Sequence, residues 1–170
     1  MGRKLRIGAA IALVLVAGCV TVASATSSGD NRSADSDGPK VVVLDLVAQV
    51  VDRQEIDEAP AGQSLGDWTV LEVDLISGGN KAGEESSICV LTRIDAVGTT
   101  TSHCKGVSTL PGGQVTTELA VKYGPNEVLK ADPYFTAIKG GTGKYRTAHG
   151  DGSLQELNQN QWRLTLRIIL

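Results

Sequence analysis

Short runs of β-branched and other apolar residues, each ended by a turn signal, fill the chain beyond residue 40. In the first run, Val41 to Val51, valines and leucines occupy both odd and even positions around Asp45 and Gln49. A strand with one buried face alternates cleanly between apolar and polar residues. This run therefore predicts a strand that is covered on both faces.

Seven further runs predict strands. They span Trp68–Ile76, Ser87–Ile94, Thr99–Val107, Gln114–Tyr123, Pro133–Lys139, Tyr145–Leu157 and Gln161–Leu170. The segments between them are rich in Gly, Pro, Asn and Asp, which are the residues of tight turns, and no run has a sustained helical period. Eight short strands of this kind predict an all-β antiparallel barrel or sandwich. We expect an eight-stranded antiparallel β-barrel, because closure leaves no free strand edge.

Five glycines lie within residues 137–152, where they could hold a phosphate or turn the chain. A phosphate loop of the Walker type needs Ser or Thr after Gly-Lys, but Tyr145 follows Lys144 here. A dinucleotide-binding fingerprint would need a further glycine where Arg146 stands, and then a helix. The run therefore predicts a tight hairpin with glycines at positive φ.

The first 25 residues read as an export signal. A basic start, made by Arg3, Lys4 and Arg6, is followed by the apolar run of residues 7–18. This run suits the core of a signal peptide and is too short to cross a bilayer comfortably. We therefore expect a bacterial protein that leaves the cytoplasm.

Two cleavage patterns follow the apolar run, and both stay open. Ala23 and Ala25 form an ordinary secretory site, which would remove residues 1–25 as the signal peptide. The small residues before Cys19 have the form of a lipoprotein box, which would remove residues 1–18 and leave Cys19 to be lipidated. The mature protein is then either secreted or anchored to the cell surface, with that lipid as its attachment to the membrane.

The rest of the chain divides into a tether and one domain. Residues 26–39 contain no aliphatic side chain larger than alanine, which predicts a disordered linker. Residues 40–170 are enough for one domain with a real core. Three of the 16 basic residues belong to the signal, so 13 remain against 19 acidic ones, a net charge of −6. This excess argues against nucleic acid as a partner.

The segment Phe135–Leu157, with its glycine hairpin, resembles the signature hairpin of allene oxide cyclases and the related plant dirigent proteins. In that family a strand ends in Gly-Gly-Thr/Ala-Gly, an aromatic residue follows, and then Ala-x-Gly. The strand from Val41, the segment around Trp68 and the cysteine at Cys89 follow the order of the family. The resemblance implies an eight-stranded antiparallel barrel with an apolar cavity, commonly assembled as a homotrimer.

The catalytic residues of the cyclases are matched only in part. The resemblance places Val47 where the enzymes have a glutamate, Gln49 and Val73 where they have asparagines, and Ala131 near the position of a tyrosine. Cys89 alone matches. Because valine cannot replace a carboxylate that steers charge, the sequence argues against allene oxide cyclisation. No catalytic residue is assigned.

Cys89 and Cys104 lie symmetrically about the predicted turn at residues 95–98, so they should face each other across adjacent strands. This predicts a disulfide, which an oxidising compartment would preserve. The alternative is a reactive Cys89 in the cavity, as the resemblance implies. His103 and Cys104 are neighbours on a strand and point to opposite faces, so we expect no metal site and no other cofactor.

Polar residues in the first strand are the candidates for cavity groups. If Val47 and Gln49 point into the cavity, as the matching residues of the family do, Asp45 also points inward, because it lies on the same face of the strand as Gln49. Tyr134 or Phe135 would then provide aromatic lining. The sequence thus predicts a binding module for an apolar small molecule. The alternatives are a dirigent-like or cyclase-like enzyme that confines a reactive substrate, and a structural cell-envelope protein with a filled barrel.

Overall fold

The computed structural model describes residues 38–125 and 132–170. The predicted signal peptide, Cys19, nearly all of the predicted linker and Ala131 lie outside the described residues. Within the described residues, no helix has the length and apolar character needed to cross a membrane.

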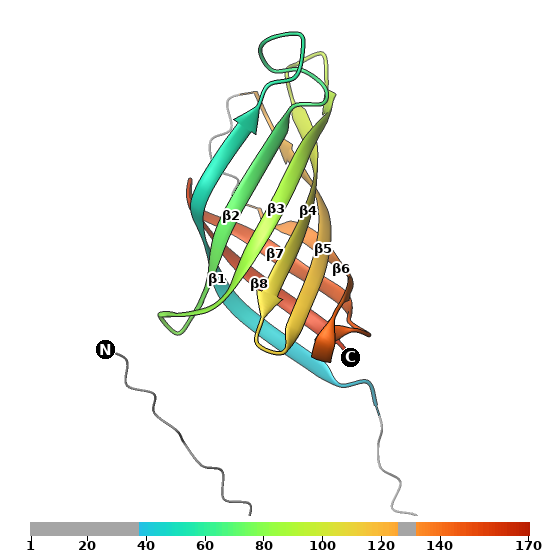
Figure 1. Ribbon diagram of the computed structural model, residues 1–170. Coiled ribbons are helices and arrows are strands. Elements are labelled where there is room, and N and C mark those ends of the chain that lie inside the picture. The colour runs from blue at the N-terminus through green and yellow to red at the C-terminus, as the bar shows by residue number, and fades with distance from the viewer. Residues whose placement is uncertain (1–37, 126–131) are drawn as a thin grey trace, which may run out of the picture. The chain divides into compact units, whose positions relative to one another are not determined.

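Eight antiparallel strands form a closed barrel in chain order, so that β1 pairs with both β2 and β8 (Figure 1). The predicted all-β class and the predicted eight-stranded barrel are confirmed. Closure gives every strand two hydrogen-bonded neighbours, which leaves no edge open. The strands are β1 (Val41–Ile56), β2 (Trp68–Ser77), β3 (Asn80–Ile94), β4 (Thr100–Leu110), β5 (Gly113–Tyr123), β6 (Tyr134–Gly141), β7 (His149–Asn158) and β8 (Gln161–Ile169).

Two strands, β1 and β3, extend furthest beyond the runs that the sequence pattern predicts. β1 continues through residues 52–56, all of which are exposed. β3 begins at Asn80, because only Gly78 and Gly79 form the turn before it, both with positive φ. These extensions carry charged and polar residues, so a search for apolar runs does not detect them.

The glycine run turns the chain, as predicted, but it does so through a short 3₁₀ turn, η1 (Gly143–Tyr145). Tyr145 from this turn is 3% exposed and belongs to the core. The Lys144 amide donates to the Gly112 carbonyl at 2.9 Å, which joins η1 to the β4–β5 turn. A Cβ atom on Gly143 would lie 2.2 Å from that same carbonyl oxygen, so the close approach requires glycine.

One half of the barrel is filled by a hydrophobic core. It lies toward the end that carries the β2–β3, β4–β5 and β6–β7 turns, and its most deeply buried apolar residues are Leu75, Val115, Leu166 and Ile168. Burial of such a side chain contributes about 1.5–3 kcal/mol each. This half therefore provides much of the apolar burial that stabilises the fold.

Alternation along β1 determines which of its residues face the interior. Leu46 and Ala48 are buried, so the even-numbered positions point inward at first. A bulge at Val51, which the register with β2 skips, then exchanges the two faces. Arg53 and Glu55, beyond the bulge, consequently line the interior.

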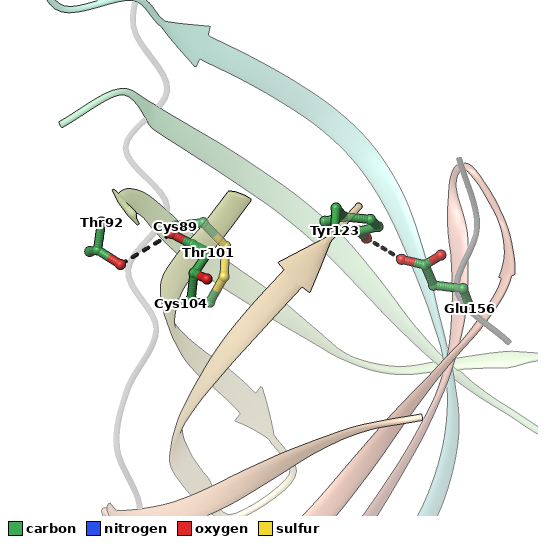
Figure 2. The surroundings of a disulfide bond; sticks show 6 residues. All are labelled: Cys89, Thr92, Thr101, Cys104, Tyr123 and Glu156. Carbon is green, nitrogen blue, oxygen red and sulfur yellow. Dashed lines mark hydrogen bonds between the residues drawn. A yellow bond between two sulfur atoms is a disulfide. The ribbon is translucent and has the colours of Figure 1, made fainter. Parts of the chain in front are cut away.

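Cys89 and Cys104 form a disulfide between β3 and β4, as predicted, with their Cα atoms 4.0 Å apart (Figure 2). The turn between these strands contains one residue more than predicted, Thr99. A bulge at Thr92 compensates for that residue and keeps the two cysteines opposite each other. The Thr92 hydroxyl donates to the Thr101 carbonyl at 3.1 Å beside the bulge.

Replacing both cysteines by serine should lower the free energy of unfolding by about 3 kcal/mol, the loop-closure term for a disulfide of this spacing. The bond joins residues that are 15 apart in the sequence. Urea unfolding of the oxidised protein and of the Cys89→Ser/Cys104→Ser variant would measure the difference. Equal unfolding midpoints, or reactive thiols at these positions in the unreduced protein, would contradict the prediction.

Candidate functional site

The other half of the barrel is hollow. A cavity of about 480 Å³ extends from the loop between β1 and β2 down to a floor that includes Ala48, Val73 and Leu164. These three residues also belong to the core of the filled half, so the core closes the cavity from below. The volume falls in the range of about 300–1,000 Å³ that is typical of small-molecule sites.

Aliphatic and aromatic side chains from seven of the eight strands, all except β4, form the wall of the cavity. Among them, the rings of Tyr123 and Tyr134 contact each other with centroids 5.8 Å apart. The disulfide lies on the same wall. Such a surface favours an apolar molecule, because binding removes apolar area from water. The apolar and aromatic lining residues above the floor are Ile56, Trp68, Leu71, Leu91, Leu119, Val121, Tyr123, Tyr134, Leu154 and Trp162.

The mouth of the cavity is polar. Arg53 and Glu55 form an exposed ion pair there, with 2.7 Å between Nη2 and Oε1. The Tyr123 hydroxyl donates to the Glu156 carboxylate (Figure 2). Burial, together with this bond, raises the pKa of Tyr123 far above its ordinary value, so the phenol stays protonated. A second hollow of about 510 Å³ shares Arg53, Tyr123 and Trp162 with the cavity and therefore adjoins its mouth.

Glu85 places a carboxyl group low in the cavity. It lies on β3 opposite Ser108 of β4, and the fully buried Ser108 hydroxyl donates to Glu85 Oε2 at 2.6 Å. Glu85 keeps some accessible surface because it faces the cavity, but the barrel wall removes water from its carboxyl. This burial raises the pKa of Glu85 above its ordinary value, and the bond from Ser108 opposes the rise only in part.

Gly106, in the middle of β4, makes room for this carboxyl. A Cβ atom at position 106 would lie 2.8 Å from Glu85 Oε1 and 3.0 Å from Thr117 Oγ1. Any side chain there would therefore push against both oxygens. We use the name polar niche for the group formed by Glu85, Gly106, Ser108 and Thr117.

Two of the residues predicted to bind a ligand point away from the cavity. Asp45 is exposed on the outer face of β1, and Gln49 lies on the same face, where its amide donates to the Asn160 carbonyl at 3.3 Å. The prediction that both point inward is wrong. The even-numbered positions face inward before the bulge, so the expected register was displaced by one residue, which exchanges the faces of a strand.

Of the two aromatic candidates, Tyr134 lines the cavity and Phe135 does not. Tyr134 is 6% exposed, whereas Phe135 is 75% exposed on the outer face of β6. Adjacent residues of a strand point to opposite faces, so only one of the two could line the cavity.

The histidines of the described chain are exposed. His103 lies on the outer face of β4, as expected from its position next to Cys104. His149 and Asp151 are exposed at the start of β7. Within residues 38–125 and 132–170, no group of three potential ligands could hold a metal ion.

Glu85 is not identified as a site residue from the sequence, because this strand is predicted to start only at Ser87. A signal for it nevertheless exists. The same register that pairs Cys89 with Cys104 places Glu85 opposite Ser108, on the inward face that carries the disulfide. Arg53 and Glu55 give no such signal, since the bulge at Val51 reverses their faces.

Several solved structures contain this barrel. Pyocyanin demethylase has a TM-score of 0.63 at 18% identity, over 74% of this chain and 99% of the other. The Diels–Alderase AbmU from Streptomyces koyangensis has a TM-score of 0.59 at 17% identity, over 79% and 70%. A nonspecific heme-binding cyclase that catalyses a 4 + 2 cycloaddition during neoabyssomicin biosynthesis has a TM-score of 0.63 at 19% identity, over 81% and 70%. No protein-family model and no curated protein matches the sequence.

Identities of 17–19% establish the fold and nothing finer. The chain has the small eight-stranded antiparallel barrel that occurs in cyclases and Diels–Alderases. The structures named here do not test the likeness to allene oxide cyclases, which stays a prediction together with the homotrimer that it implies.

Replacing Glu85 by Gln should change how stability depends on pH. The native state holds the Glu85 proton more tightly than the unfolded chain does. The stability that Glu85 contributes is therefore fully present below its ordinary pKa, 4.5, and is lost as the pH rises through its raised native value. Because glutamine does not titrate, the Glu85→Gln variant should gain stability relative to the wild type as the pH rises. Urea unfolding of both proteins between about pH 4 and 8 measures this, and parallel curves would contradict it.

Proposed function

We propose that this barrel binds an apolar small molecule in its cavity, as a protein exported from a bacterial cell. The observation that carries the proposal is the division of the barrel into a packed half and a hollow half of about 480 Å³. Empty space in a protein interior lowers stability. A barrel with a purely structural role would gain by filling this space with side chains, so the cavity favours a ligand.

The disulfide supports the proposed location. Bonds of this kind persist in oxidising compartments and are rare in the cytosol. The basic start and apolar run of the first residues support export as well. The proposal includes two locations for the exported protein: it is either secreted or anchored to the cell surface by a lipid at Cys19.

A tryptophan on the wall should exclude a ligand. Val121 and Lys122 are neighbours on β5: Val121 lines the cavity, and Lys122 is exposed on the outer face. The wild-type protein should increase the fluorescence of the neutral probe N-phenyl-1-naphthylamine. Val121→Trp should weaken probe binding by about tenfold or more, which corresponds to about 1.4 kcal/mol. Lys122→Trp, the matched control, should bind the probe as the wild type does.

Thermal unfolding of each variant would show that the fold is intact. A wild-type protein that leaves the fluorescence of the probe unchanged would contradict the proposed function. Equal weakening in both tryptophan variants would place the probe outside the cavity.

A cyclase-like or dirigent-like enzyme, which confines a reactive substrate in one shape, is a second candidate. Glu85 favours it, because a carboxyl with a raised pKa can donate a hydrogen bond or a proton in a water-poor site. The solved structures described as a Diels–Alderase and as a cyclase support the same candidate function. An uncharged linear trienone, which closes its ring slowly in water, is a suitable test substrate. Acceleration by the wild type but not by Val121→Trp would support the enzyme, and probe binding without acceleration would favour the binding module.

A further inference from the structure

The polar niche lies in a wall that is otherwise well suited to an apolar ligand. A buried carboxyl costs stability unless it is protonated and hydrogen bonded, and an apolar residue would pack at this position without that cost. We propose that the polar niche binds the polar end of the ligand, a carbonyl oxygen, while the apolar part of the molecule lies along the wall. This inference rests on the proposed function and adds the chemical class of the ligand to it.

The geometry of the niche leaves one carboxyl oxygen available to a ligand. Oε2 of Glu85 accepts the hydrogen bond from Ser108, whose side chain is fully buried. Oε1 lies beside the space that Gly106 leaves open, and the hydroxyl oxygen of Thr117 lies beside the same space. Two polar atoms from different strands therefore converge above a residue that has no side chain.

The chemistry of these atoms selects an acceptor. Burial favours the protonated form of Glu85, and because Oε2 accepts from Ser108, the acid proton is available on Oε1. The Thr117 hydroxyl is a second donor. A carbonyl oxygen has two lone pairs and can accept from both. A ligand carboxylate would instead bring a second negative group toward Glu85, which is unfavourable in a site with little water.

The position of the polar niche favours ligands that carry a hydrogen-bond acceptor over ligands that lack one. It lies at the level of Val73, which is paired with Glu85 and belongs to the floor of the cavity. Hydrogen bonds are stronger in such surroundings than in water, and a buried donor without a partner is costly. A ligand without an acceptor at its inner end should therefore bind less tightly.

The matched compounds 9-fluorenone and fluorene test this proposal, since they share a ring skeleton and differ by the carbonyl oxygen. Their affinities follow from displacement of N-phenyl-1-naphthylamine from the full chain. The wild type should bind fluorenone about tenfold more tightly than fluorene, which corresponds to one good hydrogen bond. The carbonyl stretching frequency of bound fluorenone should also fall relative to that of fluorenone in an alkane solvent, where the oxygen accepts no hydrogen bond.

Variants of the niche assign the effect to its residues. Glu85→Met should abolish both the preference and the frequency shift while fluorene still binds, and Glu85→Gln, which keeps a donor, should retain most of the preference. Ser86→Met is the matched control, because Ser86 is exposed on the outer face of the same strand. If Glu85→Met does not fold, Gly106→Ala offers a second route, since its methyl group would occupy the space beside Oε1.

The outcomes separate the two proposals. A wild-type protein that binds neither compound and no probe overturns the proposed function and this inference with it. Equal binding of fluorenone and fluorene by the wild type leaves the proposed function intact and overturns the role of the polar niche. A preference for fluorenone that survives in Glu85→Met overturns that role as well.

Discussion

A closed ring of β-strands sends every second side chain into its interior, and the size of those side chains determines how much space is left. The interior of an eight-stranded barrel is just wide enough for side chains to fill it, or for one small ligand to bind where the side chains are small. Leucine, isoleucine and a tyrosine from η1 fill the half near Leu75 and Ile168. In the other half the inward residues Gly106 and Thr117 are small, and Ala48 lies in the floor below them. The cavity is thus a consequence of residue size at inward positions.

Two β-bulges, at Val51 and Thr92, determine which residues face inward around the cavity. The bulge at Val51 moves Arg53 and Glu55 from the outer face to the mouth of the cavity, where charged groups stay in contact with water. The bulge at Thr92 has the opposite effect, since it restores the register that a longer turn would have displaced. The polar mouth of the cavity and the disulfide in its wall therefore depend on two extra residues in two strands.

On its inward face, β3 carries both a disulfide cysteine and the carboxyl group of Glu85. Cys89 joins β3 to β4 through the disulfide, and four residues earlier Glu85 meets β4 again through Ser108. Both contacts hold the same pair of strands at the wall of the cavity. A carboxyl that is desolvated in this way is a common feature of functional sites, because such a group costs stability without a compensating role in packing.

Some of these features follow from the sequence by itself and others do not. Strand number, the antiparallel all-β class, the turning role of the glycine run and the pairing of Cys89 with Cys104 follow from local signals, namely period-two patterns and turn residues. Closure into a barrel is expected because it leaves no free strand edge. The inward face of β1 and the position of Glu85 were decided only by the tertiary structure. The face of a strand depends on its register with neighbours that are distant in the chain and on bulges within it, as the outward position of Asp45 shows. A shift of one residue reverses that face without any change in the local pattern, which is why the polar residues of the cavity had to be found in the folded barrel.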